Sequence, residues 1–448
     1  MRKAQKEQAT EFLKSLCQAN KEIKRALEHS EQALAMGLLE QCQEGAIALG
    51  NVIEQSEGED FAAVRLLEEY CERIYQLHEK LRQGLFIKVG KEYKVLQNFI
   101  MQAENSVRND IKERREVVFL PYKASMWDSL ESVWRAADAD PNCDAYVIPI
   151  PYYNKNLDGS FREMHYEGNL YPKDVPVIWY KDYDFEERRP DVVFIHNPYD
   201  GVNLVTSVHP DFFSDKLKRY TERLVYIPYF LLPEIDPKNT EAIKRIEDFC
   251  TAPAVVNADT VILQSEAMRQ IYIDVLSRHA GEHTRKIWEK KILGLGSPKV
   301  DKVLRTRKED LEIPEDWLNI IRKADGTWKK IVFYNTGMAA LMEHGEKTLS
   351  KMRSVFETFK NNQEEVALLW RPHPLIKATL SSMRPYLWTA YEEILEEYRS
   401  EGWGIYDDTA DLDRAVILCD AYYGDGSSVV QLCLKVNKPV MIQNLRIL

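Results

Sequence analysis

The sequence contains no apolar run long enough to cross a membrane. A spanning helix needs about 18 to 20 mainly apolar residues, and none of the stretches in these 448 residues comes near that length. The first residues, MRKAQKEQATEF, also lack the apolar segment of a secretory signal peptide. The sequence therefore predicts a cytoplasmic protein, with any membrane contact peripheral and at the inner face.

Metal and disulfide patterns are missing as well. The seven cysteines stand singly, at positions 17, 42, 71, 143, 250, 419 and 433, and none forms a Cys-x-x-Cys pair. Isolated cysteines of this kind are typical of reduced core thiols. We expect no disulfides, no zinc site and no resident cofactor.

Several catalytic motifs are absent too. The sequence has no P-loop, no dinucleotide-binding Gly-x-Gly-x-x-Gly after its first predicted strand, no His-Glu-x-x-His and no Gly-x-Ser-x-Gly. Kinase, dehydrogenase, zinc-protease and serine-hydrolase functions therefore have no support. The formal net charge of −11 also disfavours a general nucleic-acid binder.

Residues 1–112 are expected to be helical almost throughout, with one break at Gln55–Asp60. Apolar residues recur three and four apart, and charges of both signs alternate on the remaining face. We predict a helical hairpin or bundle, serving as an interaction module or as an arm for homo-oligomerisation. Binding of these helices to a membrane surface is the weaker alternative, because their polar face is mixed in sign.

The pattern changes near residue 113 to short apolar segments that alternate with helical ones. An N-terminal domain, 113–300, has expected strands at 117–121, 145–150, 175–180, 191–196, 224–229 and 260–264, and helices near 126–137 and 241–249. Residues 292–298 are expected to lead from a strand into a linker, and 301–329 to be charged and helical.

A C-terminal domain, 301–448, repeats the alternation. Its expected strands are 330–334, 366–370, 404–406, 421–423 and 439–442, separated by helices at 345–361, 384–400, 410–419 and 427–436. This alternation predicts an α/β protein with two doubly wound parallel-sheet, Rossmann-like domains. Ligands of such domains bind at the carboxyl ends of the strands, in the cleft that the domains face.

The turn after the fourth C-terminal strand is the best candidate for binding an anion. Its sequence is Gly424-Asp425-Gly426-Ser427-Ser428, followed by an apolar-periodic stretch. We expect a strand, a tight turn and a helix capped by serine, where free N–H groups favour a phosphate. Taken alone, an ordinary capped turn is the likelier explanation of this stretch, and the functional interpretation depends on the rest of the chain.

Other C-terminal strands also end in polar loops. The first ends in Asn335-Thr336-Gly337 and the second in Arg371-Pro-His373-Pro. Arg371 is suited to clamp phosphate oxygens, and His373 to donate to them or to protonate a leaving group. The alternatives are a surface ion pair for Arg371 and a core histidine for His373.

In the N-terminal domain, His196, Asp200 and His209 are candidates for the general base. His196 and Asp200 follow the strand at 191–196, and His209 lies in the next segment. Such a group at the carboxyl end of a strand could accept the proton of an acceptor hydroxyl. Turn chemistry at Asn197-Pro and Asp200-Gly is the alternative explanation.

The motif series resembles the CDP-glycerol glycerophosphotransferases, the teichoic-acid primases and polymerases of bacterial cell envelopes. It consists of Arg371-Pro-His373-Pro, Asp411-Leu-Asp-Arg414, Asp420-Ala-Tyr-Tyr-Gly-Asp-Gly-Ser-Ser428 and Lys438-Pro-Val-Met-Ile442. Gly296-Ser-Pro-Lys-Val-Asp301 is similar to the inter-domain segment of that family. The resemblance covers about residues 116–448, leaves out the helical region, and implies the GT-B fold.

By that resemblance, Ser427, Ser428 and His373 would contact the donor diphosphate, with Arg371 assisting. The chain departs from the family at its Trp-His-Gly-Thr motif, whose histidine is the expected base. The corresponding strand here, at 224–231, has no histidine. The sequence also ends soon after its last predicted strand, which leaves little for the crossing-back helix common in GT-B proteins.

These features predict a transferase that moves glycerophosphate, or a similar alditol phosphate, from a CDP-activated donor to a hydroxyl of a polymer or lipid-linked acceptor. A Mg²⁺ carried by the donor diphosphate is compatible with the sequence. One alternative is a nucleotide-sugar glycosyltransferase or epimerase on the same fold. Another is a non-catalytic protein that binds a nucleotide or polymer and acts through its N-terminal helices.

Overall fold

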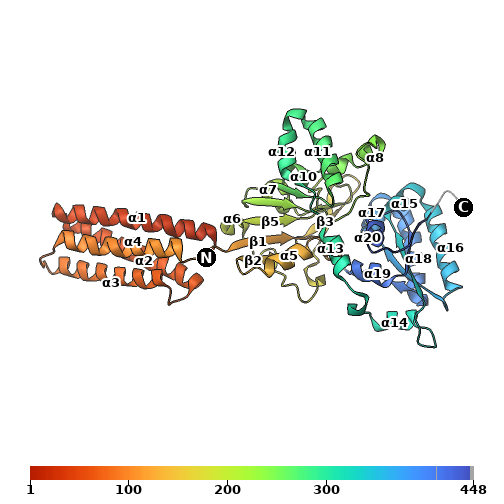
Figure 1. Cartoon of the computed structure of the whole chain (residues 1–448), viewed down its shortest axis with the longest axis horizontal. Helices are drawn as coiled ribbons and strands as arrows, with labels where there is room; N and C mark the ends of the chain where they lie inside the picture. Colours follow the sequence, from red (N-terminus) through yellow and green to blue (C-terminus); the bar gives the residue numbers. More distant parts are fainter. Residues whose placement is uncertain (410, 444–448) are drawn as a thin grey trace. The chain divides into compact units, whose positions relative to one another are not determined.

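The computed structural model describes residues 1–409 and 411–443, which fall into two compact units (Figure 1). The first unit contains Met1–Glu116 together with Asp140–Asp144. The second contains the remaining described residues and carries both α/β domains.

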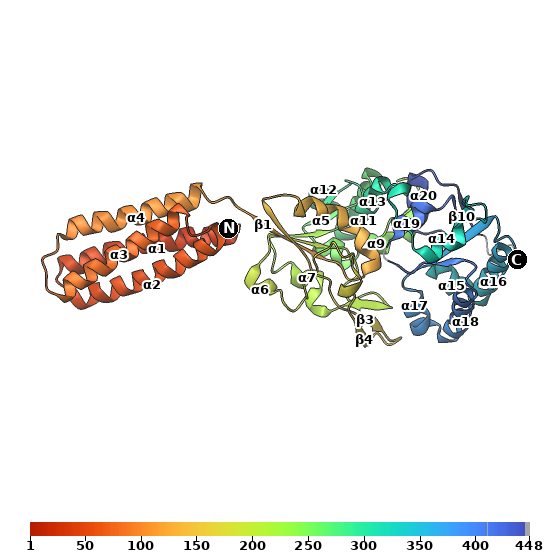
Figure 2. The same cartoon turned by 90° about the horizontal axis from the view of Figure 1, so that it is seen from below.

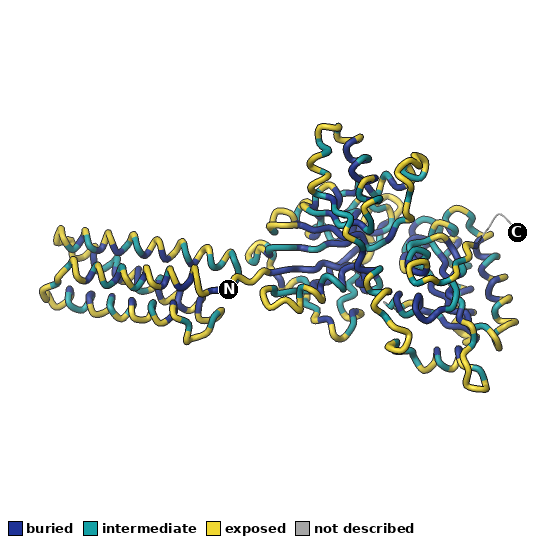
Figure 3. Tube along the Cα trace, viewed as in Figure 1, coloured by how far each residue is buried: buried dark blue, intermediate teal, exposed yellow. Residues whose placement is uncertain are grey.

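The first unit is a bundle of four long helices, all within the described chain (Figure 2). They are α1 (Lys3–Glu28), α2 (Gln32–Glu57), α3 (Ala62–Arg82) and α4 (Val89–Asn109). Figure 3 shows buried positions along the sides of the helices that face one another and exposed positions along their outer sides. The core includes one buried hydrogen bond, from the Tyr70 hydroxyl to Asn20 Oδ1 at 2.8 Å. The apolar period predicted helices in a hairpin or a bundle, and the structure shows the bundle.

Two of the three helix breaks were not predicted. The expected break appears between α2 and α3, but the chain also turns at His29–Glu31 and at Gln83–Lys88. Ser30 adopts a φ of 61°, which is uncommon for a residue other than glycine. The apolar period runs across that turn without a glycine or proline to mark it, so the sequence pattern could not reveal it.

A six-stranded sheet forms the N-terminal α/β domain, in the order β2-β1-β5-β7-β8-β9. Within this sheet, the pairings of β1 with β5, β5 with β7, β7 with β8 and β8 with β9 are parallel. The strands are β1 (Arg115–Leu120), β2 (Cys143–Val147), β5 (Val192–Ile195), β7 (Arg223–Tyr226), β8 (Thr260–Ile262) and β9 (Ile292–Leu293). Its helices include η1 (Ala124–Ser129), α5 (Glu131–Asp138), α8 (Thr240–Arg245), α9 (Glu247–Cys250) and α11 (Glu266–Ala280).

The strand predicted at 175–180 is wrong. This segment is a loop that makes a single bridge, between Val147 and Val177. Pro176 lacks the N–H that a ladder needs, which explains why the apolar run does not extend into a strand.

A small antiparallel sheet was also missed. It has the order β4-β3-β6 and contains β3 (Tyr152–Lys155), β4 (Phe161–His165) and β6 (Thr206–Val208). The turn between β3 and β4 contains Asp158-Gly159, with Gly159 at a φ of 84°. An Asp-Gly pair between two such segments is a hairpin signal, and it was available in the sequence.

The five strands predicted in the C-terminal domain are all present, as one parallel sheet in the order β12-β11-β10-β13-β14. They are β10 (Lys330–Thr336), β11 (Val366–Pro372), β12 (Ile405–Tyr406), β13 (Ala421–Gly424) and β14 (Val440–Ile442). The helices around them are α15 (Met338–His344), α16 (Glu346–Lys360), α17 (Ile376–Met383), α18 (Pro385–Glu401), α19 (Leu412–Leu418) and α20 (Ser428–Lys435). The predicted helix at 410–419 is α19; residue 410 lies outside the described residues.

This sheet is covered on both faces. Along β10 and β11, Ile331, Phe333 and Leu369 pack into one apolar cluster. Tyr334, Leu368 and Trp370 pack into a second cluster on the opposite face. Because neighbouring residues of a strand point to opposite faces, two clusters of this kind require helices on both sides of the sheet.

The two sheets are joined through α13 (Pro298–Arg305), η5 (Lys308–Asp310) and α14 (Glu315–Ile321), the segment predicted to be charged and helical. Two doubly wound parallel-sheet domains, preceded in the chain by an all-helical region, form the predicted α/β architecture of the GT-B class. In both domains the strand order reverses beside the first strand, where doubly wound folds place their ligands.

Candidate functional site

A cavity of about 1030 Å³ lies between the two α/β domains. The N-terminal domain contributes residues that follow β1 and the loop around Glu167–Asp174. The C-terminal domain contributes the loops after β11 and β12 and parts of α17 and α18. The cavity therefore lies at the carboxyl ends of strands from both sheets, as predicted for the cleft of a doubly wound pair.

Arg371 reaches this cavity from the end of β11, where it pairs in register with Asn335 of β10. Its guanidinium is largely buried and donates from Nη1 to Asp407 Oδ2 and from Nη2 to the Thr409 carbonyl, each at 2.6 Å. Asp407 is fully buried. The ion pair fixes the plane of the guanidinium and leaves three of its five N–H groups for other partners.

His373 also lines the cavity, two residues further along the same loop. Its backbone N–H donates to the Thr336 carbonyl, and its Nδ1 accepts from the Leu375 N–H at 3.1 Å. Since Nδ1 is an acceptor, the neutral ring carries its hydrogen on Nε2. Burial in the cleft, reinforced by the charges of Lys123 and Lys299, lowers the pKa of His373 to about 4. At neutral pH the ring is an uncharged hydrogen-bond donor.

Lys123 faces the cavity from the N-terminal domain, in the short loop between β1 and η1. Its Nζ donates to the Tyr152 hydroxyl at 2.7 Å and to Glu167 Oε1 at 3.3 Å, and it lies 4.2 Å from the centre of the Tyr152 ring. Burial lowers the pKa of Lys123, and the Glu167 carboxylate opposes that shift. Sequence reasoning missed this residue, although it stands at the carboxyl end of a predicted strand.

Glu167 is the second group that sequence reasoning missed. Its Oε1 accepts from the Tyr152 hydroxyl at 2.7 Å, and its Oε2 accepts from the Ala124 N–H at 2.9 Å. The carboxylate lines the cavity and is held from three sides. No motif marks it, because it belongs to a loop after the unpredicted hairpin of β3 and β4.

The predicted phosphate turn has the expected form of a strand, a tight turn and a helix. Ser427 caps α20, and its Oγ accepts from the Val429 N–H. Gly424 has a φ of 147°, and a Cβ there would lie 2.1 Å from the Asn335 carbonyl oxygen. This approach brings the ends of β10 and β13 together and requires glycine.

The same turn is tied closely to its neighbours. Ser427 Oγ donates to Asn335 Oδ1 at 3.0 Å, and Asp425 accepts from the Gly337 N–H at 2.6 Å and from the Gln443 side chain. Burial raises the pKa of Asp425. The sheet thus brings together most of the residues predicted to bind phosphate, but as a second cluster that does not line the cavity (Asn335, Gly337, Asp425, Gly426, Ser427 and Ser428).

Thr336 completes the predicted set. It is fully buried at the end of β10, and its Oγ1 accepts from Trp370 Nε1 at 3.1 Å. Its carbonyl holds the backbone of His373. Thr336 thus lies behind the cavity-lining loop, with its side chain turned into the domain core.

His196 lies in the interior of the N-terminal domain and does not line the cavity. Its Nε2 accepts from the Tyr122 N–H at 3.1 Å, so the neutral ring donates from Nδ1 to Ser129 Oγ at 2.8 Å. Burial, with a smaller effect of Lys299, lowers the pKa of His196 to about 3. Both ring nitrogens are occupied in joining the end of β1 to η1.

Asp200 and His209 also lie away from the cavity. Asp200 is buried and accepts from the Ser214 N–H at 3.0 Å and from Ser214 Oγ at 2.6 Å. Burial raises the pKa of Asp200 to about 6. His209 caps the short helix η3 (Pro210–Phe212) by accepting from the Asp211 N–H. The three histidine and aspartate candidates are therefore not brought together with Arg371 and His373.

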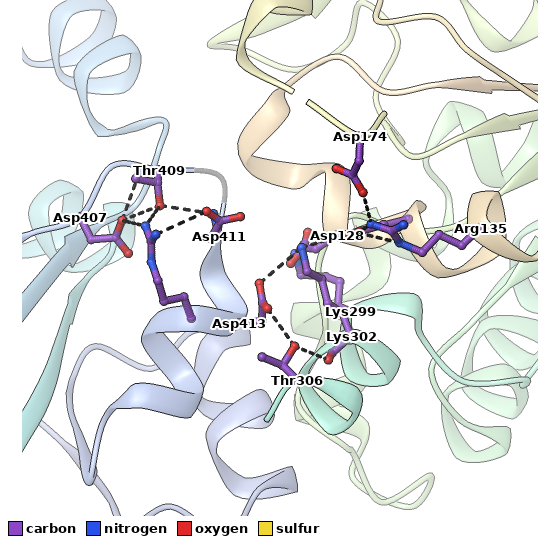
Figure 4. Close-up of polar contacts among 12 residues, drawn as sticks. Asp128, Arg135, Asp174, Lys299, Lys302, Thr306, Asp407, Thr409, Asp411 and Asp413 are labelled. Atoms are coloured by element: carbon purple, nitrogen blue, oxygen red, sulfur yellow. Dashed lines mark hydrogen bonds and ion pairs between the residues drawn. The ribbon is translucent and has the colours of Figure 1, made fainter. Parts of the chain in front are cut away.

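Helix α13 connects the two halves of the site (Figure 4). Lys299 contacts both carboxylate oxygens of Asp128 in η1, at 2.5 and 2.6 Å. Lys302, one turn further on, contacts Glu131 at 2.7 Å and Asp413 of the C-terminal domain at 3.4 Å. One helix thus makes charged contacts with both α/β domains.

The remaining lining of the cavity is divided by chemistry. Trp388, Tyr391 and Tyr406 form an aromatic wall, with the Trp388 and Tyr391 rings stacked at 5.8 Å. Carboxylates line other parts of the cavity (Asp174, Glu312, Asp407, Asp408 and Asp411). Within residues 1–409 and 411–443, no group of three or more His, Cys, Asp or Glu side chains is arranged to hold a metal ion. In the same residues, no helix has the length and apolar character to span a membrane.

Comparison with known proteins finds similarity only at the level of structure. No protein-family model matches the sequence, and no curated protein matches it. The MnaA–UDP co-structure from S. aureus matches at 11% identity and a TM-score of 0.44, over 73% of this chain and 78% of that one.

Two further solved structures show a similar level of structural similarity. UDP-GlcNAc 2-epimerase of Methanocaldococcus jannaschii, with UDP-GlcNAc and UDP, matches at 14% identity and a TM-score of 0.43, over 73% and 83% of the two chains. A variant of the wall teichoic acid polymerase TagF matches at 13% identity and a TM-score of 0.39, over 83% and 78%. Similarity this low assigns neither a family nor an activity to this chain.

Proposed function

We propose that this chain is a transferase that binds a nucleotide-diphosphate donor in the inter-domain cavity and transfers a group to an acceptor hydroxyl. The specific donor we propose is CDP-glycerol or a similar CDP-alditol, used in building a cell-envelope polymer. One observation carries the proposal: Lys123 from one domain meets Arg371 and His373 from the other in a single cavity that also has an aromatic wall.

The basic end of the cavity suits a diphosphate. Two of the three Nζ hydrogens of Lys123 are used by Tyr152 and Glu167, and the third is available. His373 offers its Nε2 hydrogen, and Arg371 offers N–H groups not used by Asp407 and Thr409. Donors fixed in this way stabilise the negative charge that develops on a departing nucleotide.

The aromatic wall suits a nucleobase. Trp388 and Tyr406 line the cavity with rings held by their contacts with the buried Tyr391 and Trp370, so little side-chain freedom is lost when a base stacks on them. The carboxylates of Asp408 and Asp411 are suited to accept hydrogen bonds from ribose or polyol hydroxyls.

Glu167 is the proposed general base. In the proposed step the acceptor oxygen bonds to the donor phosphorus, the bond from that phosphorus to the bridging oxygen breaks, and the nucleotide leaves with that electron pair. The acceptor proton passes to Glu167, which already faces the cavity and is oriented by Tyr152 and the Ala124 N–H. His196 and His209 lie elsewhere, so in this proposal neither takes that role.

A nucleotide-sugar transferase or epimerase is the second candidate, supported by the same cavity. The acidic lining that suits glycerol or ribose hydroxyls suits a sugar equally well. In that case the reaction centre is a sugar carbon, and UDP-sugars replace CDP-glycerol as ligands.

Calorimetric titration of the full chain with CDP-glycerol, CDP, UDP and UDP-sugars tests the proposal. We expect cytidine-selective binding that weakens about tenfold in Lys123→Met and in His373→Ala, which remove one charge-assisted or neutral hydrogen bond each. His209→Ala is the matched control, because that histidine does not line the cavity. Absence of binding by every nucleotide at millimolar concentration would reject the proposal and favour a non-catalytic function.

The predicted contact of Ser427 and Ser428 with the donor has its own test. If the phosphate extends to that turn, Ser427→Ala with Ser428→Ala weakens CDP-glycerol binding as much as Lys123→Met does. If the phosphate stays at Lys123 and His373, the serine variant loses helix-cap stability of about 1 kcal/mol and keeps its affinity.

A further inference from the structure

The loop between α3 and α4 holds the most exposed large hydrophobic side chain of the described chain. Phe86 is 85% exposed, and its neighbour Leu85 is 54% exposed. Leu34, in the first turn of α2, is also 54% exposed. The Gln32 side chain donates to the Leu81 carbonyl, so α2 begins beside the end of α3. Three apolar side chains therefore project from one end of the bundle.

The conformation of this loop is fixed by backbone hydrogen bonds and by packing. Gly84 has a φ of 67°, and the N–H of Leu85 donates to the Lys80 carbonyl at 2.9 Å, which closes α3 with a Schellman-type turn. Ile87 packs against the bundle core. A hydrophobic residue just after such a turn usually packs back on its helix. Here Ile87 turns inward while Leu85 and Phe86 are held outward.

The surroundings of the loop are basic. From Arg82 to Lys94 the chain has four basic residues and one acidic residue (Arg82, Lys88, Lys91 and Lys94; Glu92). Glu92 is buried and already paired with Arg73 and Lys80, and Arg82 is paired with Glu79. Among the described residues, no ion pair neutralises Lys88, Lys91 or Lys94. The neighbouring turn adds Glu31, and Glu28 there is paired with Lys24. Against the chain's net charge of −11, this end of the bundle is locally basic.

We propose that the loop between α3 and α4, together with the lysines of the adjoining first turns of α4, docks the protein on the surface of an anionic lipid bilayer. Leu85 and Phe86 would enter the boundary between headgroups and acyl chains, while the lysines contact anionic headgroups. The apolar side chains lie on a projecting loop and not on the outer face of a helix, so the mixed charges of the helical faces do not oppose the contact.

The shape and charge of the loop favour a bilayer over the other occupants. A stable protein–protein interface buries about 800 Å² on each partner, which three exposed side chains at one end of the bundle do not supply. A second copy meeting this loop end to end would place like charges against each other, which is destabilising. A lipid surface needs no matching contour and supplies the opposite charge.

Vesicle flotation of the full chain tests the proposal. The probes are vesicles of phosphatidylcholine alone and of phosphatidylcholine mixed with phosphatidylglycerol. We expect flotation with the mixed vesicles only, weakening as salt is added. Leu85→Ser with Phe86→Ser should lower binding about tenfold or more. Each of Lys88→Gln, Lys91→Gln and Lys94→Gln should lower it about fivefold.

Tyr75→Ser is the matched control, because Tyr75 is an aromatic residue 53% exposed on the flank of α3. It should float as the wild type does, and melting curves should show that all variants are folded. The proposal is overturned if the wild type does not float with the mixed vesicles, or if the Leu85 and Phe86 variant floats equally well. Binding to a protein partner or to nucleic acid that needs Phe86 without lipid would also overturn it.

Discussion

Lys299 Nζ of α13 donates to both carboxylate oxygens of Asp128, at 2.5 and 2.6 Å, and both side chains are almost completely buried. A buried ion pair is costly to break from one side, because the remaining charge keeps its desolvation penalty without its partner. Asp128→Asn should therefore lower the free energy of unfolding of the α/β unit by about 3 to 5 kcal/mol. Urea denaturation followed by tryptophan fluorescence measures the loss.

The matched control removes both charges. Asp128→Leu combined with Lys299→Met should recover most of that stability, because no unpaired charge stays buried. A double variant as unstable as Asp128→Asn would show that the pair contributes packing geometry and not charge compensation.

Lys123 and Lys299 both act on His373 through space. Burial is the largest cause of its lowered pKa of about 4, and the two cations come next. Lys123→Met should raise the pKa of His373 towards 6.5, by an amount that shrinks as salt is added. NMR titration of the imidazole signals measures it, with His373→Gln assigning the resonance. An unchanged pKa would mean that burial alone holds the ring neutral.

His196 should make stability depend on pH below neutrality. Its pKa is about 3 in the folded chain against 6.5 for an ordinary histidine. Between these values the unfolded state binds more protons, so stability is full above about pH 6.5 and falls as the pH drops towards 3. The loss attributable to this residue is at most about 5 kcal/mol. Chemical denaturation at pH 7 and pH 4.5 should show His196→Gln to be less pH-dependent than the wild type.

Asp200 should show the opposite sign. Burial raises its pKa to about 6 from an ordinary 3.8, so between these values the folded state binds more protons. Its contribution favours folding at low pH and is lost as the pH rises through 6. Asp200→Asn can still form hydrogen bonds with Ser214. Between pH 4 and pH 7, its free energy of unfolding should rise relative to that of the wild type by at most about 3 kcal/mol. Equal pH profiles for the two proteins would contradict the raised pKa.

Gly424 is expected to tolerate no side chain. A Cβ at this position would lie 2.1 Å from the Asn335 carbonyl oxygen, and the backbone there has a φ of 147°. Gly424→Ala should lower the free energy of unfolding by about 3 kcal/mol or more, because the backbone of β10 must move. Gly426→Ala, two residues away, is the control, since no atom lies within 4 Å of its added Cβ. Thermal denaturation of the two variants should separate them clearly.

The sequence alone determined the elements whose signals are local. The five strands of the C-terminal sheet were predictable because each is a short apolar run between polar loops, and the Ser427 cap because capping depends on neighbouring residues only. The helical bundle followed from an apolar period that any buried helix must have. The prediction of a strand at 175–180 was wrong because it followed the apolar character of the segment and disregarded the missing backbone N–H of Pro176.

Only the tertiary structure decided which polar residues share a space. His196 and His373 look alike in sequence, since each follows an apolar strand. Packing places His196 inside one domain with both ring nitrogens bonded, and leaves His373 at the cavity. Glu167 joins Lys123 only because an unpredicted hairpin folds its loop over the end of β1. Such meetings depend on the relative placement of distant segments, which is set by the burial of entire sheets and not by local patterns.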